Sequence, residues 1–194
     1  MDTFGTLNQR VIRLNQVELH KNYALVITTN SGLWRYLIGD TIRFTSLSPY
    51  RIKVTGRTKH HINVFGEELM VENTDAALAK TCKEHLCEII DYTVAPIFMT
   101  NEQKGAHEWI IEFKTKPDNI ENFRKALDEN LQSVNSDYEA KRYNNMTLNP
   151  LVLNIARENL FYDWLKQEDK LGGQHKVPRL SNERTYLESL LSLK

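Results

Sequence analysis

Two glycines near predicted strand ends are each followed by a residue that could bind the sugar of a nucleotide. Asp40 follows Gly39 at the end of the stretch LWRYLIGD, and Arg57 follows Gly56. An ionised carboxylate only accepts hydrogen bonds, so it suits the two hydroxyl donors of a ribose. The planar guanidinium of arginine suits ribose or phosphate oxygens. Taken alone, each residue is better explained as part of a turn, because Gly and Asp are common in turns.

A second glycine-rich stretch precedes a lysine near the C-terminal end. Gly172 and Gly173 come shortly before Lys176, and glycines before a lysine can let the backbone and the ammonium approach a phosphate. The stretch lacks the GxxxxGK(S/T) spacing of a nucleotide P-loop. The residues alone therefore favour a flexible loop here.

The metal-ligating and nucleophilic residue types form no recognisable site. His60 and His61 are adjacent, so their side chains point apart in an extended chain, and no further ligand spacing accompanies them. Cys82 and Cys87 lie in a helical pattern whose geometry places them on diverging faces. We therefore expect neither a metal site nor a disulfide.

Strands must position Asp40 and Arg57. Stretches that are β-branched or alternate in polarity lie at residues 23–29, 33–37, 41–45 and 51–55. Gly39 and Asp40 are expected to break the chain between the second and third of these strands. This part has no helical pattern, so its strands would leave apolar faces and edges bare if they stood alone. We expect it to be a piece of a larger domain, or to pack on something else.

Helical spacing appears only after residue 61. Apolar residues recur at helical spacing from about residue 74 and again over 119–134, with strands between and after them. The apolar residues Trp109, Ile111 and Phe113 alternate with charged residues, which is typical of a half-buried strand. The charged residues are Glu108, Glu112 and Lys114. The order from residue 62 is β-α-β-β-α-β-α-α. It predicts an α+β chain in which a β-rich N-terminal segment precedes a ferredoxin-like, split β-α-β domain.

Composition and charge exclude several classes of protein. The 25 basic and 25 acidic residues give a formal net charge of zero, which argues against nucleic acid as the main partner. No apolar run approaches the ~18 residues of a membrane span. The first residues lack the layout of a signal peptide. With no disulfide expected, a cytoplasmic protein fits best.

Taken together, three segments resemble one family, the Gretchen Hagen acyl acid amido synthetases. This auxin-responsive family of plants has bacterial relatives and belongs to the adenylate-forming superfamily. Residues 36–40 are similar to its Tyr-Arg-x-Gly-Asp motif, residues 56–67 to its hinge motif and following loop, and residues 174–179 to its Gln-x-Lys-x-Pro-Arg segment. The arginine of the first motif is replaced by Leu37, with Arg35 nearby, so the contact made by that arginine is not carried over.

The resemblance implies a nucleotide site in the first part of the chain. Residues 1–58 would be the C-terminal strands of the large adenylate-forming domain. Asp40 would bind the ribose hydroxyls of ATP, with Tyr36 beside the adenine. Arg57 would help to hold the ribose or the phosphates.

The resemblance also implies a moving part. Residues 59–194 would be the mobile C-terminal α+β domain, which swings about a hinge at Lys59 between two half-reactions. Lys176 would be catalytic, because its ammonium would stabilise the negative charge that develops when the acyl carboxylate attacks the α-phosphate.

The expected reaction joins a carboxylic acid to an amino acid through an acyl-AMP, with ATP and Mg²⁺ as cofactors. The phosphate loop and the acid pocket of the family belong to an N-terminal domain of the same protein. We therefore expect this chain alone to be inactive. An acyl-CoA ligase of the same superfamily and a non-catalytic α+β binding module remain alternatives, although the Lys-Val-Pro-Arg ending favours the amide-forming branch.

Overall fold

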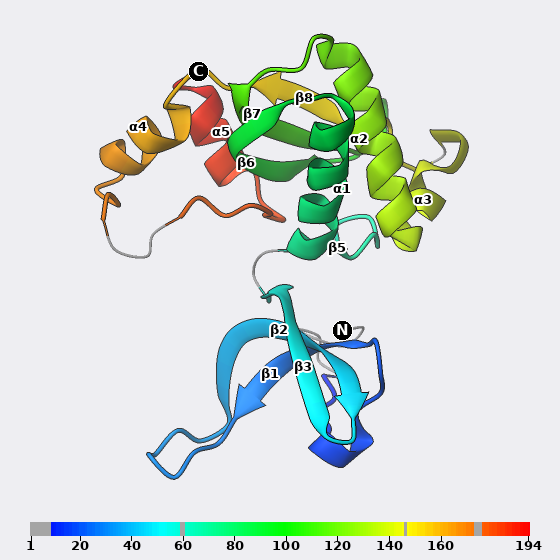
Figure 1. The fold of residues 1–194 in the computed structure, drawn as a ribbon, viewed down its shortest axis with the longest axis vertical. Helices are drawn as coiled ribbons and strands as arrows, with labels where there is room; N and C mark the ends of the chain where they lie inside the picture. The colour runs from blue at the N-terminus through cyan, green and yellow to red at the C-terminus, as the bar shows by residue number, and fades with distance from the viewer. Residues whose placement is uncertain (1–8, 59–60, 146, 173–175) are drawn as a thin grey trace. The chain divides into compact units, whose positions relative to one another are not determined.

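The computed structural model describes residues 9–58, 61–145, 147–172 and 176–194 (Figure 1). The chain divides into two compact units, Met1–Lys59 and His60–Lys194, which are described separately. Among the described residues, no helix combines the length and the apolar character needed to cross a membrane.

The first unit is built on an antiparallel sheet in the order β1-β2-β3. Its elements are η1 (Leu14–Gln16), β1 (Asn22–Ile27), β2 (Tyr36–Leu47) and β3 (Tyr50–Arg57). Ile42 and Phe44 of β2 are buried, and the rings of Tyr23 and Tyr50 pack edge-on against Phe44. The expected β-rich N-terminal segment is therefore confirmed.

One long strand replaces two expected ones. β2 continues through Gly39 and Asp40, because Gly39 adopts a φ of +90° that lets the strand bend without ending. The expectation of a strand break at these residues is wrong. The pairing with β1 and β3 shifts register on either side of Thr41, which is how the sheet absorbs the irregularity.

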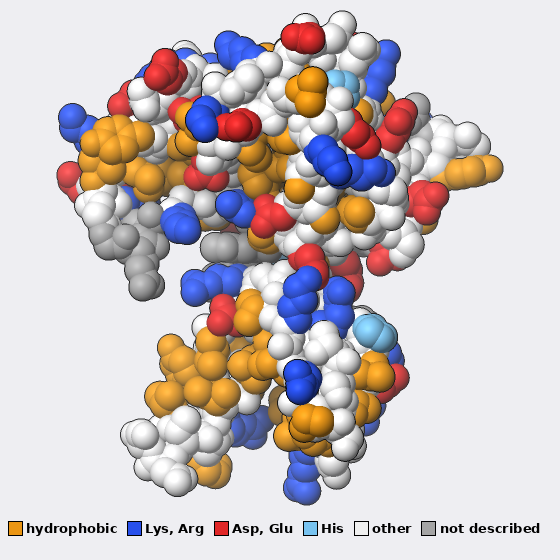
Figure 2. Space-filling view, in the orientation of Figure 1, with side chains coloured by type: hydrophobic (Ala, Val, Ile, Leu, Met, Phe, Trp, Pro, Cys, Tyr) orange, Lys and Arg blue, Asp and Glu red, His pale blue; other side chains and the backbone are white. Residues whose placement is uncertain are grey.

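Many large apolar side chains of the first unit remain exposed, and Figure 2 shows them over the β1-β2-β3 sheet. The exposed set on its strands and their connection is Val26, Leu33, Trp34, Tyr36, Leu37, Ile38, Leu47, Tyr50, Ile52 and Val54. Exposed apolar side chains in this number are typical of a surface that packs against a partner.

The second unit is built on a main sheet in the order β6-β7-β8. Its strands are β6 (Glu88–Ile97), β7 (Ala106–Thr115) and β8 (Val152–Ile155); β6 runs antiparallel to β7, and β8 runs parallel to β7. The strand expected near residue 62 is β4 (His61–Ile62), and it pairs with β5 (Leu69–Met70) outside the main sheet. The free edge of β6 carries a parallel bridge between Val94 and Leu180.

Helices cover both faces of this main sheet (Figure 1). The helices are α1 (Val71–Glu84), α2 (Ile120–Val134), α3 (Ser136–Arg142), α4 (Leu160–Gln167) and α5 (Thr185–Leu191), and η2 (Tyr143–Asn145) follows α3. Trp109 and Ile111 of β7 pack with α1 and α2 in one buried cluster, and Ile110 packs with α4 and α5 in the other. The expected α+β class is confirmed.

Because helices cover both faces of the sheet, β7 is buried on both sides and not half-buried as expected. Glu112 was expected on the wet face of a half-buried strand, but it is buried. Its carboxylate accepts hydrogen bonds from the backbone N–H groups of Asn159, at 2.6 Å, and Phe161, at 3.3 Å, where α4 begins. A carboxylate at this position satisfies otherwise unpaired donors of the helix N-terminus.

The two cysteines lie beside each other. α1 ends at Glu84, Leu86 takes a φ of +51°, and the N–H of Cys87 returns to the carbonyl of Cys82 at 3.1 Å. The expectation that the cysteines diverge is wrong, because it assumed an uninterrupted helix. Both thiols are free, and burial together with the neighbouring thiol raises the pKa of Cys87 to about 12.

Candidate functional site

Asp40 and Arg57 are brought together by the pairing of β2 with β3. They are opposite each other in the register, and Nε of Arg57 lies 3.3 Å from Oδ1 of Asp40. The Asp40 side chain is 29% exposed and that of Arg57 is 64% exposed. An ion pair this exposed contributes little to stability, so both groups remain available to a ligand.

The backbone around Gly39 fixes the direction in which the Asp40 side chain projects from β2. Thr58 donates from its N–H, at 2.8 Å, and from its hydroxyl, at 3.3 Å, to the carbonyl of Gly39. The positive φ of Gly39 is strained for any residue with a side chain. The region beside Gly39 is open, because a Cβ there would meet only the Thr58 hydroxyl, at 3.9 Å. The glycine therefore leaves room for a ligand to approach.

Tyr36 begins β2 and is half-exposed, opposite Ile27 of β1. It pairs with a different neighbouring strand from Asp40, which pairs with β3. Leu37, at the position of the missing motif arginine, is also partly exposed. The ring and the carboxylate thus belong to the same strand, with the bend at Gly39 between them.

Two parts of the expected site lie outside the described residues. Lys59, expected at the hinge, is one of them, as are residues 173–175 of the C-terminal motif. Lys176 is described and is exposed, in the second unit.

The residues that follow Lys176 are anchored along the free edge of β6. Val177 is buried in the cluster of α4 and α5. The hydroxyl of Thr93 donates to the carbonyl of Pro178 at 2.7 Å. Val94 exchanges two backbone hydrogen bonds with this segment, one to the carbonyl of Arg179, at 2.9 Å, and one from the N–H of Ser181, at 3.1 Å. Lys176 therefore stands immediately before a segment held like an added strand.

Arg179 of the same motif lies in a polar cluster that sequence reasoning missed. Its Nη1 donates to both carboxylate oxygens of Asp75, each at 2.8 Å. Asp75 also accepts a hydrogen bond of 2.6 Å from the hydroxyl of Tyr92, and the Arg179 guanidinium lies 5.2 Å from the centre of that ring. Burial and the bond to Asp75 raise the pKa of Tyr92, so its hydroxyl stays a donor. Apart from the motif arginine, nothing in the sequence singled out this cluster.

Asp91, on β6, is an acidic neighbour of Lys176. Burial raises the pKa of Asp91, and Glu112, its cross-strand partner, raises it further. The Tyr92 backbone N–H, Arg179 and Lys176 act in the opposite direction. The surroundings of Lys176 thus contain a carboxyl group that responds to its charge.

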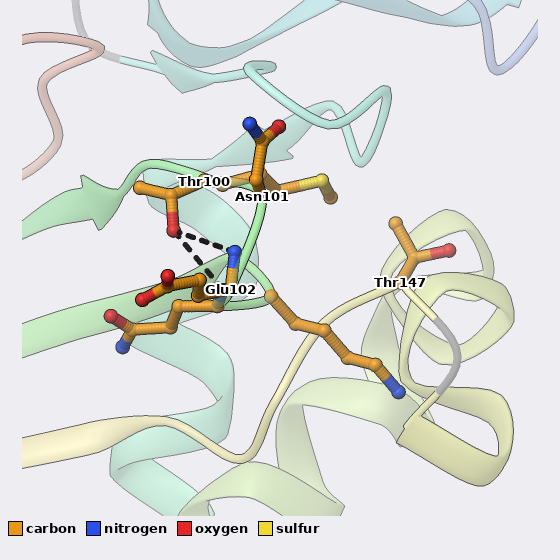
Figure 3. Close-up of a pocket in the computed structure, with 7 residues that line it drawn as sticks. Thr100, Asn101, Glu102 and Thr147 are labelled. Atoms are coloured by element: carbon orange, nitrogen blue, oxygen red, sulfur yellow. Dashed lines mark hydrogen bonds between the residues drawn. The ribbon is translucent and has the colours of Figure 1, made fainter.

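A shallow pocket lies elsewhere, at the turn between β6 and β7 (Figure 3). It is lined by residues 99–104 and Thr147, and the Thr100 hydroxyl accepts hydrogen bonds from the backbone N–H groups of Glu102 and Gln103. None of the expected site residues lines it. Within the described ranges, no three His, Cys, Asp or Glu side chains gather as a metal site would require.

Comparisons with known proteins match both units to one family. Residues 2–57 match the model of the GH3 family central domain, and residues 72–185 match that of the GH3 family C-terminal domain. The chain is 26% identical to indole-3-acetic acid-amido synthetase GH3.3 of Arabidopsis thaliana, over 95% of this chain and 33% of that protein. It is also 26% identical to jasmonoyl–L-amino acid synthetase GH3.5 of Oryza sativa subsp. japonica, over 88% of this chain and 30% of that protein. The chain thus spans about a third of the length of the curated relatives it matches.

Solved structures show the same fold. The GH3.15 acyl acid amido synthetase superposes with a TM-score of 0.70 at 21% identity, covering 94% of this chain and 35% of that one. A structure of AtGH3.15 acyl acid amido synthetase in complex with 2,4-DB gives a TM-score of 0.66, covering 93% and 34%.

Proposed function

This chain belongs to the GH3 family, and from that premise we propose that it forms the C-terminal part of an ATP-dependent ligase that joins a carboxylic acid to an amino acid. The observation that carries the proposal is the order of the two family matches. The central-domain match contains Asp40 and ends at Arg57, and these two residues are in contact. The C-terminal match contains Lys176. The amido synthetases among the relatives support a reaction that forms an amide.

The first half-reaction activates the acid as an acyl-AMP with release of pyrophosphate, and the amine of the amino acid then displaces AMP. In this scheme Asp40 accepts hydrogen bonds from the two ribose hydroxyls of ATP. Its carboxylate has capacity for this beside the single contact with Arg57, because a carboxylate offers about four acceptor sites. Tyr36 lies beside the adenine, and Mg²⁺ accompanies the ATP phosphates.

Lys176 supplies a positive charge to the first half-reaction. Attack of the carboxylate oxygen on the α-phosphorus concentrates negative charge on the phosphate oxygens, and a positioned ammonium stabilises that charge. Lys176 suits this role because its side chain is exposed while the following segment is held on β6. Lys59 is proposed as the hinge that brings residues 59–194, and Lys176 with them, to and from the nucleotide.

Pyrophosphate exchange into ATP tests the proposal on the full-length enzyme, screened over carboxylic acids. We expect exchange with a subset of acids and amide formation once an amino acid is added; product formation only with coenzyme A would favour the acyl-CoA ligase instead. The chain alone should show no exchange. If no acid supports exchange in the full-length enzyme, the proposed ligase activity is refuted.

The residue roles need separate variants. Asp40→Ala should weaken ATP binding, and an unchanged affinity would remove Asp40 from the ribose site. Lys176→Ala should slow adenylation by about 10²–10³-fold, the loss seen when one charge-stabilising donor is removed. It should have little effect on amide formation from preformed acyl-AMP. Equal losses in both half-reactions would contradict the role of Lys176.

A further inference from the structure

We propose that Asp75 is a positioning residue for Lys176 and that it acts through Arg179. The inference rests on the function proposed above for Lys176. Asp75 lies on α1 and Arg179 lies 104 positions later, so their contact joins the first helix of the second unit to the segment that carries Lys176.

The guanidinium of Arg179 is fixed by Asp75 and by the ring of Tyr92. The ring is in turn held in place: it stacks on Trp109 at 5.5 Å with an angle of 19°, and its hydroxyl bonds Thr74 at 2.7 Å and Asp75 at 2.6 Å. Tyr92 and Trp109 are fully buried side chains. Arg179 therefore rests on a rigid support, and the Asp75 carboxylate sets its orientation on that support.

The order of Arg179 is transmitted over three residues to Lys176. Pro178 has a restricted φ and its carbonyl is bound by Thr93, and Val177 is buried. The backbone between Lys176 and Arg179 thus has few free torsions. When Arg179 is released from Asp75, the backbone hydrogen bonds of the segment to Thr93 and Val94 remain, but the side-chain restraint at one end of this short link is lost, and we expect the Lys176 backbone to gain freedom.

Because the ion pair between Asp75 and Arg179 is exposed, its effect on the position of Lys176 can be distinguished from its effect on folding stability. The side chains of Asp75 and Arg179 are 45% and 44% exposed. Ion pairs of this kind contribute about 0–1 kcal/mol to folding. Val177 and Leu180 are buried and keep the segment attached without the ion pair. Loss of Asp75 should therefore act on the placement of Lys176, where a shift of about 1 Å can cost on the order of 10²-fold in rate.

A double-mutant cycle in the full-length enzyme tests this inference. Asp75→Ala should lower kcat of adenylation by about 10–100-fold, with an unchanged KM for ATP and an unchanged rate of amide formation from preformed acyl-AMP. Asp75→Glu should recover part of the loss. Combining Asp75→Ala with Lys176→Ala should be no worse than Lys176→Ala alone, because Asp75 acts only through Lys176.

Glu121 offers a matched control. It forms an ion pair with Arg124 on α2, at 2.6 Å, in which Glu121 is 57% and Arg124 21% exposed. Glu121→Ala should leave both half-reactions unchanged. Multiplying losses in the double variant, or an equal loss in amide formation, would overturn the positioning role of Asp75 while leaving the proposed ligase activity intact.

A second measurement is independent of catalysis. Backbone ¹⁵N relaxation of this chain should show that Asp75→Ala lowers the order parameter of Lys176 toward the flexible range below about 0.6, whereas Glu121→Ala does not. If the enzyme proves not to be a ligase, this comparison still decides whether Asp75 orders Lys176. An unchanged order parameter for Lys176 would refute the inference.

Discussion

The buried ion pair between α2 and α3 gives the largest stability effect that we predict. Asp128 accepts hydrogen bonds from Nε, at 3.0 Å, and Nη2, at 2.7 Å, of Arg142, and each side chain is only 7% exposed. Asp128 also accepts from the hydroxyl of Tyr138, at 2.7 Å, and from the N–H of Leu151, at 3.3 Å. The perturbation is Asp128→Ala, which removes the acceptor that these donors share with the side-chain amide of Gln132, at 3.0 Å.

The expected loss follows from what remains buried. Arg142 keeps its hydrogen bond from Nη1 to the carbonyl of Leu148 at 2.8 Å, but it loses the carboxylate that binds both its Nε and its Nη2. Breaking a buried pair by removing one partner costs about 3–5 kcal/mol. That is a large share of the ~5–15 kcal/mol that stabilises a typical domain. Asp75→Ala breaks a half-exposed pair and removes one partner of the buried Tyr92 hydroxyl, which keeps its contact with Thr74, so it should cost less, about 1–2 kcal/mol.

Urea unfolding measures this difference. Trp109 and Trp164 report on the second unit, and Trp34→Phe removes the signal of the first unit, where Trp34 is 79% exposed. The control variant Asp128→Leu/Arg142→Met removes both charges and should lose less than Asp128→Ala, because it does not leave the Arg142 charge buried without Asp128. A loss below about 1 kcal/mol for Asp128→Ala, or a larger loss in the control, would refute the reasoning.

Three further predictions concern single sites. Burial raises the pKa of Asp91, so the folded state holds that proton more tightly than the unfolded chain does; Asp91→Asn should therefore raise the urea midpoint at pH 7, and the gain should disappear as the pH falls below the unfolded pKa. Burial raises the pKa of Cys87 apart from the contribution of Cys82, so in a Cys82→Ser chain its labelling by a disulfide reagent at pH 8 should be at least about 10-fold slower folded than unfolded; equal rates would contradict the burial. Gly105→Ala would place a Cβ 2.5 Å from the Phe65 ring and should cost about 1–3 kcal/mol in the same urea assay, with partial recovery on adding Phe65→Leu.

The sequence pattern correctly predicted those helices and strands that are determined by residues close together in the chain. The helix expected over 119–134 is α2, Ile120–Val134, because the apolar residues recur at helical spacing and the Asn119 side chain caps the first turn by accepting from the N–H of Asn122. The family that the three motifs indicated is confirmed by the two domain matches.

The missed features depend on distant parts of the chain. The alternation predicted that Glu112 faces solvent. Nothing near Glu112 in the sequence shows that the N-terminus of α4, some 47 positions later, packs against its carboxylate. The helix expected from about residue 74 ends at Glu84, and two residues later Leu86 adopts a left-handed conformation that its residue type does not suggest.

The candidate site divides in the same way. Asp40 and Arg57 were identified from type and motif, and their direct contact follows from the β2–β3 register. Asp75 has no motif of its own. Its relation to Arg179 exists only through the packing of α1 on the sheet, which a reading of local spacing cannot supply.

The segment that covers the β6 edge also has a consequence for synthesis of the protein. Thr93 and the Pro178 carbonyl that it binds are 85 positions apart, so at ~5–20 residues per second the ribosome delivers the partner roughly 4–17 s after β6. Until then the edge of β6 presents unpaired N–H and C=O groups, which invite pairing with other chains. The nascent second unit is therefore open to association through this edge during the interval, and a chain that stops before Val177 should be prone to aggregation.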